Sequence, residues 1–360
     1  MRTSYRWGII GTGGIARAFA KGLSLLPEAK LFAVGSRTRE AADRFAEDFH
    51  VPRAHASYEA LAADPEVDIV YVATPHILHK DNSLLSLRNG KAVLCEKPFA
   101  INAAEAAEVL RLAREKNLFV LEAMWTRFLP AIVRVREILA SGMIGEPRWL
   151  AADFGFKAPD NPKSRIFDPA LGGGALLDVG VYPVSLASMI FGPPSGISSQ
   201  ARLGATGVDE QDAIVLSYDG GRLATLNACV TMTTPTEAVI SGEKGILRIH
   251  TPFFRPRRIS LGVNKLAGLG EKKMAWLRRA ARMVPAVSRL RESLEGRHGR
   301  SIHIPYKGNG LHYQAAEVMR CLDRGLRESP VLPWSETLSI METMDKIRAQ
   351  WGLVYPSEKS

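Results

Sequence analysis

Glycines near the N-terminus could bind the phosphates of a dinucleotide. Gly11, Gly13 and Ala16 fit the spacing G-x-G-x-x-A, directly after the apolar run 6–10 and before a helical pattern. The first glycine permits a tight turn, the second lets the backbone approach a pyrophosphate, and the alanine lets helix and strand pack closely. The helix start adds free amides and a partial positive charge. We therefore expect a bound dinucleotide; a glycine turn without a ligand is the alternative.

The end of the second predicted strand indicates which dinucleotide this is. Chains that bind NAD usually carry an acidic residue about 20 residues after the glycine turn, where it holds the ribose 2′-hydroxyl. Here the sequence is Ser36-Arg37-Thr38-Arg39, and a guanidinium with hydroxyls suits a 2′-phosphate. We expect NADP(H) to be preferred over NAD(H); solvated arginines at a helix start are the alternative.

A glycine-rich segment in the second half carries a carboxylate and a phenol. Gly172-Gly173-Gly174 leads into a helical run in which Asp178 and Tyr182, four residues apart, share one face. Pro183 removes a backbone amide, so we expect the helix to be kinked or to end there. Taken alone, Asp178 and Tyr182 could be a buried structural pair in which the carboxylate satisfies the phenol.

Polar residues also follow other predicted strands, at the edge where open α/β sheets bind ligands. His76 and His79 follow the strand 68–74, and Lys97 follows the strand 92–95 and precedes a proline. The two histidines could be a metal pair, but no third ligand has suitable spacing, so we expect no metal. The residues expected to contact the cofactor are Gly11, Thr12, Gly13, Gly14, Ile15, Ser36, Arg37, Thr74, Pro75, His76, His79, Glu96 and Lys97.

Alternating strand and helix patterns position these residues. Strand-like runs at 6–10, 31–34, 68–74, 92–95 and 118–121 are separated by helical patterns, and Asn102 with Glu105 marks a helix start of capping-box type. This alternation predicts an α/β Rossmann domain with a doubly wound parallel sheet over residues 1–123. Runs at 149–156, 213–218, 223–230 and 238–249 are typical of strands joined by hairpin turns. We expect residues 124–360 to form an α+β domain with a large, mostly antiparallel open sheet.

Composition limits the class of protein. The chain has 360 residues, 46% of them hydrophobic and 23% charged, which excludes a disordered or collagen-like chain and favours two domains. We expect no membrane span, because the apolar stretches fall short of about 20 residues. Neither a signal-peptide core nor a disulfide framework is recognisable, since the three cysteines are scattered. These features favour a cytoplasmic location.

The net charge of +10 resides in one segment. Residues 253–300 carry 13 lysines and arginines against three glutamates, and the rest of the chain is balanced. Within this segment, residues 274–284 can form a helix with one apolar and one cationic side. That helix could cover its own domain, contact a partner or second subunit, or dock reversibly on an anionic membrane surface. Nucleic acid is not expected as a partner, because the segment lacks interleaved aromatics and any recognised motif.

Together these residues resemble the Gfo/Idh/MocA oxidoreductase family, which includes glucose-fructose oxidoreductase and inositol dehydrogenase. The resemblance covers nearly the whole chain. It rests on the glycine turn, on Glu96-Lys97-Pro98 after a Rossmann strand, and on G-G-G-x-x-x-D-x-G-x-Y at 172–182. Residues 122–128 and 165–167 resemble the branch that contains trans-1,2-dihydrobenzenediol dehydrogenase and NADP-dependent D-xylose 1-dehydrogenase.

The resemblance implies roles for individual residues. Tyr182 would be the general acid/base, Lys97 would lie beside the nicotinamide and lower the pKa of the phenol, and Asp178 would orient the site. A substrate pocket between the domains would be lined by Trp125, Arg127 and Phe154, although each aromatic could equally be part of a core. The second domain would bind substrate and mediate a homodimer or homotetramer. The basic segment 253–300 resembles an insertion, because relatives have far fewer residues at this place.

The function implied is hydride transfer between NADP(H) and a cyclic polyol, an aldose or a trans-dihydrodiol. An alternative within the same class is a sugar-ketone or dicarbonyl reductase. An alternative in a different class is a non-catalytic NADP-binding regulator that acts through its basic helix.

Overall fold

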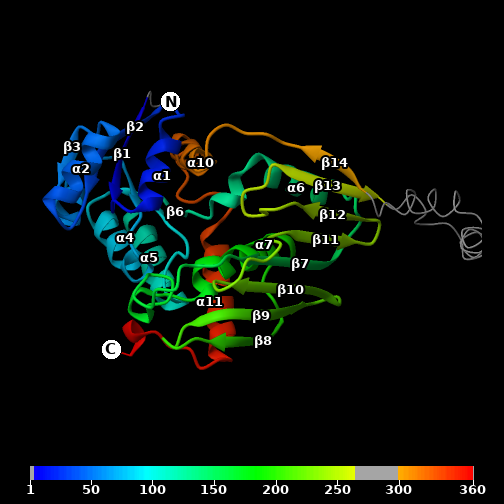
Figure 1. Ribbon diagram of the computed structural model, residues 1–360. Helices are drawn as coiled ribbons and strands as arrows, with labels where there is room; N and C mark the ends of the chain where they lie inside the picture. Colours follow the sequence, from blue (N-terminus) through cyan, green and yellow to red (C-terminus); the bar gives the residue numbers. More distant parts are fainter. Residues whose placement is uncertain (1–3, 264–298, 360) are drawn as a thin grey trace, which may run out of the picture.

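Two β-sheets, each with its own helices, make up the computed structural model, which describes residues 4–263 and 299–359. The first sheet, at the blue end of the chain in Figure 1, is formed by the N-terminal third, and the second by residues 147–303. Most of the basic segment, including the predicted helix at 274–284, lies outside the described residues.

The first sheet is parallel and has the strand order β3-β2-β1-β4-β5-β6, which is a doubly wound arrangement. Its order reverses between β1 and β4, so a crevice for a ligand is expected beyond the carboxyl ends of these strands. The strands are β1 (Tyr5–Ile10), β2 (Ala29–Gly35), β3 (Arg53–His55), β4 (Ile69–Val72), β5 (Ala92–Cys95) and β6 (Val120–Glu122). The helices are α1 (Gly14–Leu23), α2 (Arg39–Phe49), α3 (Tyr58–Ala62), α4 (His79–Arg88) and α5 (Ala103–Lys116).

Local sequence accounts for these elements. β4 and β5 are short apolar runs whose residues are all buried, as expected for the centre of a parallel sheet. The predicted helix start at Asn102 is confirmed, because the Asn102 side chain accepts a hydrogen bond from the Glu105 amide at 2.8 Å. The edge strand β3 has only three partly buried residues, two of them charged or polar, so periodicity gives no signal for it.

The second sheet has eight strands in the order β14-β13-β12-β11-β7-β10-β9-β8, and all neighbouring strands are antiparallel except β7 and β10. The predicted mixed, mostly antiparallel sheet is therefore confirmed. Its strands are β7 (Pro147–Gly155), β8 (Gly196–Leu203), β9 (Asp209–Tyr218), β10 (Arg222–Cys229), β11 (Ala238–Gly242), β12 (Gly245–Ile249), β13 (Arg258–Val263) and β14 (Arg300–His303). One helix, α6 (Pro130–Ala140), precedes β7, and α7 (Val181–Phe191) lies between β7 and β8 in the chain. Two further helices, α10 (His312–Asp323) and α11 (Trp334–Ala349), follow β14. Short helical turns are η1 (His76–Leu78), η2 (Trp125–Phe128), η3 (Pro169–Leu171), η4 (Leu176–Gly180) and η5 (Pro356–Glu358).

The sequence analysis expected the helix that carries Tyr182 to be kinked at Pro183 or to end there, and the structure shows that it does not end there. A π-helical turn over Leu176–Gly180 leads into α7, which continues to Phe191. Pro183 has no backbone amide to donate, and the π turn directly before it departs from the regular i→i−4 hydrogen bonding at this point of the helix. The segment Pro169–Phe191 is long and apolar enough to span a membrane by composition, which the sequence analysis did not expect, but 83% of its apolar window is buried inside the protein. This burial is that of a core helix.

The C-terminal helices connect the two sheets. α11 packs against both α5 and α7, and α10 packs against α1 and η2. The Trp334 indole donates to the Val120 carbonyl of β6 at 3.0 Å, and the Tyr5 hydroxyl donates to Asp323 at 2.8 Å. The last 50 residues therefore hold the elements of the two sheets against one another.

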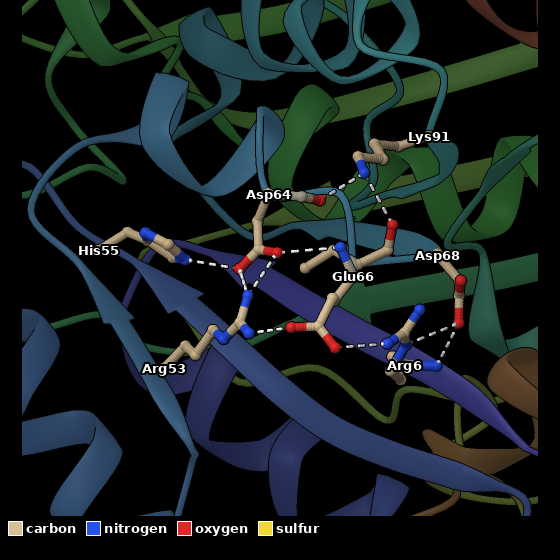
Figure 2. A network of polar contacts seen from close by, with 8 residues as sticks. Arg6, Arg53, His55, Asp64, Glu66, Asp68 and Lys91 are labelled. Carbon is tan, nitrogen blue, oxygen red and sulfur yellow. Dashed lines mark hydrogen bonds and ion pairs between the residues drawn. The ribbon is translucent and has the colours of Figure 1, made fainter.

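A polar network closes the edge of the first sheet at the amino ends of its strands (Figure 2). The Arg53 guanidinium contacts both Asp64 and Glu66, and Glu66 also accepts from Arg6 at 2.9 Å. Lys91 donates to the backbone carbonyl of Asp64 at 2.5 Å. Since ligands bind at the opposite edge of such sheets, this network is structural.

Candidate active site

The glycine turn leaves an open cradle at the start of α1. Gly11 has φ +104°, and a Cβ there would lie 2.7 Å from the Ala73 carbonyl oxygen, so only glycine fits. A Cβ at Gly13 or Gly14 would meet nothing within 4 Å, and no side chain caps the helix. Unpaired amides therefore face exposed space, which suits a pyrophosphate. Thr12 and Ile15 lie on the same turn, and Ile15 is 37% exposed.

The carboxyl end of β2 presents cationic and hydroxyl groups. Ser36 is buried, whereas Arg37 is exposed, and its guanidinium interacts with the phenol of Tyr58. Arg39 is engaged by the Ala54 carbonyl at 2.8 Å and by Asp43 at 3.5 Å. Arg37 is thus the arginine that remains open to a ligand at this strand end.

Two buried histidines organise the loops after β4 and β5. His79 places Nδ1 2.7 Å from the Pro98 carbonyl oxygen and Nε2 2.9 Å from that of Thr74, so the ring lies between these two loops, and its neutral form donates to one of the two carbonyls. His76 Nδ1 lies 2.9 Å from the Gly172 carbonyl oxygen. Burial lowers the pKa of His76 to about 3 and that of His79 to about 4, so both are neutral near pH 7. Among the described residues, no group of three or more His, Cys, Asp or Glu side chains could hold a metal ion.

Lys97 and Asp178 form the charged centre of the site. The Lys97 ammonium donates to the Asp178 carbonyl at 2.6 Å and lies 3.7 Å from its carboxylate. The same carboxylate accepts from Arg165 at 2.7 Å and lies 4.0 Å from His76 Nε2. Burial opposes ionisation of Asp178, but Lys97, Arg165 and His76 outweigh it and lower its pKa to about 2. For Lys97, burial is outweighed by Tyr182, Asp178 and Glu96, so its pKa is raised and the amine is charged.

Glu96, which precedes Lys97 in the chain, is also buried. Its carboxyl accepts a short hydrogen bond from the Tyr71 hydroxyl. Burial raises the pKa of Glu96 to about 6, although Tyr71 and Lys97 favour the carboxylate. Thr74, which lies two residues after the end of β4, accepts from Asn82 at 3.2 Å, and Pro75 follows it.

Tyr182 is buried beside Lys97, but its hydroxyl is hydrogen-bonded to Trp125 and not to Asp178. Its hydroxyl accepts from the Trp125 indole at 2.9 Å, and the Lys97 ammonium lies 4.8 Å from its ring centroid. Burial raises the pKa of Tyr182, while Lys97 and Trp125 lower it, so the phenol is protonated at neutral pH in this ligand-free state. The predicted helix face brings Asp178 and Tyr182 to the same site, with Lys97 between the carboxylate and the phenol.

An aromatic wall surrounds the phenol. Phe154 and Phe254 stack with centroids 4.3 Å apart, and each ring lies against Tyr182, at 5.3 and 5.6 Å respectively. Trp125 meets Phe254 edge to face at 6.1 Å. The structure thus gathers the predicted Trp125 and Phe154 around Tyr182. Phe254 was not predicted, because its only signal is a pair of phenylalanines next to a strand.

Arg127, predicted as a wall residue, is engaged inside the protein. Its guanidinium donates to Ser185 and to Glu336 Oε1, the latter at 2.6 Å, and its side chain is only 2% exposed. Glu122 lies nearby, fully buried, with its pKa raised to about 7 by burial against the attraction of Arg127. In this structure Arg127 fixes η2, and with it Trp125, rather than facing an open pocket.

Comparison with known proteins shows what this chain is similar to. A family model described as "Oxidoreductase family, NAD-binding Rossmann fold" (Gfo/Idh/MocA) matches residues 5–123, and the model of the GFO/IDH/MocA C-terminal domain matches residues 132–248. The trans-1,2-dihydrobenzene-1,2-diol dehydrogenase of Homo sapiens is 37% identical over 358 residues, covering 98% of this chain and 99% of that protein. The Xenopus tropicalis protein of the same name is 35% identical over 355 residues, with the same coverage.

Solved structures of oxidoreductases are also similar to this chain over nearly its whole length. KijD10, a 3-ketoreductase from Actinomadura kijaniata in complex with NADP and TDP-benzene, superposes with a TM-score of 0.79 at 25% identity, covering 96% of this chain and 97% of that one. The aldose-aldose oxidoreductase from Caulobacter crescentus has the same TM-score at 20% identity, covering 98% of this chain and 99% of that one. The latter similarity is one of fold.

Proposed function

This chain belongs to the Gfo/Idh/MocA family of oxidoreductases, and on that premise we propose that it transfers hydride between NADP(H) and a cyclic polyol, aldose or trans-dihydrodiol. The observation that carries the proposal is the buried Lys97–Tyr182 pair at the edge where the glycine turn would hold the cofactor. The aromatic wall beside Tyr182 fits an apolar ring face, and the named activities of the relatives are of this kind.

The cofactor contacts follow from groups that are open in the structure. The amides at Gly13 and Gly14 would hold the pyrophosphate, and Arg37 the 2′-phosphate. When bound, the nicotinamide accepts or supplies the hydride. His79 keeps the loops after β4 and β5 in place, so that Lys97 faces the same crevice.

Tyr182 would move the proton. In the reducing direction its protonated phenol donates to the carbonyl oxygen, and in the oxidising direction its anion takes the hydroxyl proton. The hydrogen bond from Trp125 and the charge of Lys97 both stabilise the anion. Asp178 would hold Lys97 in place and keep it charged.

Substitution of Tyr182 by Phe tests the proposal. The variant keeps the ring and its packing but lacks the proton, so kcat should fall by roughly two orders of magnitude or more while NADPH binding is retained. Reduction of NADP⁺ followed at 340 nm over pentoses, hexoses, inositols and trans-dihydrodiols provides the activity. NADPH fluorescence provides the binding control. Unchanged turnover in Tyr182→Phe would contradict the proton-transfer role.

A reductase acting on a sugar ketone is the second candidate. It is favoured by the similarity to KijD10, whose name is that of a 3-ketoreductase. The protonated phenol of the ligand-free state is also the form needed to reduce a carbonyl. NADPH oxidation by keto-sugars, faster than NADP⁺ reduction by the matching alcohols at pH 7, would favour this direction.

We propose further that the protein is a cytoplasmic homo-oligomer. All three cysteines are free and buried, which is compatible with a reducing compartment. The face of the second sheet that is turned away from α7 carries several exposed apolar side chains, and a second copy of the chain would cover them. Localisation of the tagged protein and the mass of the purified protein in solution test these two points.

A further inference from the structure

A small basic cavity lies beside the candidate active site. It has a volume of about 270 Å³, and no carboxylate is among its lining residues. Two arginines, a tyrosine, an asparagine and a threonine supply its polar side chains, and the lining consists of Thr251, Pro252, Arg255, Arg257, Tyr306, Gly308 and Asn309.

The two guanidiniums of this cavity form no ion pair with any residue that the structure describes. Arg257 lies over the Tyr306 ring at 4.4 Å, is hydrogen-bonded to the Tyr306 hydroxyl, and donates to the Gly308 carbonyl at 3.4 Å. Arg255 lies over the Phe254 ring at 5.6 Å, and the Tyr306 hydroxyl donates to its backbone carbonyl at 3.3 Å. By contrast, Arg248 on the same sheet is paired with Glu237 at 2.8 Å. Most of the donors of Arg255 and Arg257 are therefore available to an anion.

Two contacts connect this cavity to Tyr182. Phe254 has the Arg255 guanidinium 5.6 Å from its centroid and the Tyr182 ring at 5.6 Å as well. At Gly310, with φ +93°, an added Cβ would lie 3.2 Å from the Tyr306 ring and 3.3 Å from Trp125. Phe254 and Gly310 thus lie between the cavity and the aromatic wall, so that the two are one layer of residues apart.

We propose that Arg255 and Arg257 bind a phosphoryl group of the substrate whose carbinol or carbonyl carbon lies at Tyr182. The substrate class becomes a phosphorylated aldose or cyclitol, and this inference rests on the proposed function. Planar guanidinium forks match the geometry of phosphate oxygens. The Tyr306 ring lies against Arg257, and its hydroxyl donates to the Arg255 carbonyl, so Tyr306 positions the two arginines. The phosphates of the cofactor are a poorer match, because their expected place is the open turn at Gly13. The cavity instead borders Asn309, which bonds to Ala18, further along α1, at 2.7 Å.

Binding of inorganic phosphate tests the cavity without relying on turnover. Isothermal titration should detect phosphate binding to the protein saturated with NADPH, weakened about 10- to 100-fold in Arg255→Gln and Arg257→Gln. The neighbouring Arg258→Gln is the matched control, since Arg258 contacts His250 at 3.3 Å and does not line the cavity. Lack of phosphate binding, or equal binding in all variants, would overturn the proposal. Phosphate binding that NADPH abolishes would overturn it too, because the cavity would then belong to the cofactor.

Kinetics with matched substrates test the link to Tyr182. The ratio of kcat/KM for a phosphorylated aldose to that for the neutral aldose should exceed 1 and fall about 10- to 100-fold in Arg255→Gln or Arg257→Gln, but not in Arg258→Gln. A ratio insensitive to both arginines would refute a shared substrate. Because Tyr182→Phe should still bind phosphate, failure of the proton-transfer role and failure of this cavity give different results.

Discussion

At the scale of single residues, Lys97 is surrounded by groups that attract its positive charge. It lies near the carboxylate of Asp178, the carboxyl of Glu96 and the ring of Tyr182, and the attraction of all three keeps it protonated. The resemblance implied that Lys97 lowers the pKa of the phenol. Lys97 does so, but burial outweighs it, so the pKa of Tyr182 is raised in the absence of ligands. Oxidation of an alcohol is therefore expected to accelerate as the pH rises.

Arg37 is expected to determine the choice of cofactor at the same scale. In Arg37→Ala the binding of NADPH should weaken about 10- to 100-fold and that of NADH far less, because only the former loses a charge-assisted contact to the 2′-phosphate. Arg39→Ala is the control, since Arg39 is already engaged by Ala54 and Asp43. Fluorescence titration of both nucleotides measures the effect. Equal losses for the two nucleotides would rule out this role for Arg37.

At the scale of elements, the loops that follow β4 and β5 depend on a neutral His79. The unfolded chain binds a proton at its ordinary pKa near 6.5, whereas burial lowers the pKa of folded His79 to about 4. Between these values the unfolded state binds more protons. The contribution of His79 to the free energy of unfolding is thus complete above pH 6.5 and falls by about 1.4 kcal/mol per unit as the pH drops towards 4.

The variant His79→Gln isolates this contribution. Its amide can still donate to Thr74 or Pro98 but does not titrate, so it should be less stable than the wild type at pH 8 and approach it at pH 5. The carbonyls of Pro98 and Thr74, which raise the pKa of His79, and the charges of Lys97 and Arg165, which lower it, are present in both proteins. Urea unfolding at pH 8, 6.5 and 5 gives the two curves. Parallel curves would show that His79 is not buried in its neutral form.

Elements with a strong local signal were predictable, and those set by distant contacts were not. The glycine turn, the alternating strands and the cap at Asn102 are short-range patterns, and the structure confirms them. The path of α7 through Pro183 required a π turn that no periodicity indicates. The hydrogen bond from Trp125 to Tyr182 joins residues 57 positions apart. The arginines that follow Phe254 line a cavity together with Tyr306 and Asn309, about 50 residues away, so their sequence alone does not indicate a binding site.

At the scale of the molecule, the two faces of the second sheet differ: one packs against the candidate active site, and the other is an exposed apolar surface. Phe154, on β7, belongs to the face that packs against α7 and Tyr182. Alternate residues point the other way. Pairing of β7 with β10 places Trp149 beside Leu223, and pairing of β10 with β9 places Thr225 beside Val215. Trp149, Leu223 and Val215 are 38%, 42% and 41% exposed, so this outer face is an apolar surface away from the candidate site.

A second copy of the chain is the occupant that we propose for this outer face. Arg248, paired with Glu237, lies on this face through the register of β12, β11 and β7, so each copy presents both signs of charge, which a self-complementary twofold interface can match. Leu223→Glu should weaken self-association by roughly 100-fold or more, because a carboxylate would be buried against apolar side chains. Analytical ultracentrifugation of the wild type should show a dimer or tetramer, and that of the variant a shift towards the monomer.

Val354→Glu is the matched control for this experiment. Val354 is 49% exposed but lies after α11, outside the sheet, so its substitution should leave the oligomer intact. NADPH should bind the Leu223→Glu monomer, since the glycine turn and Arg37 are in the first sheet and its helices. A wild type that stays monomeric at high micromolar concentration, or a Leu223→Glu variant that associates as tightly as Val354→Glu, would show that the outer face is not the interface.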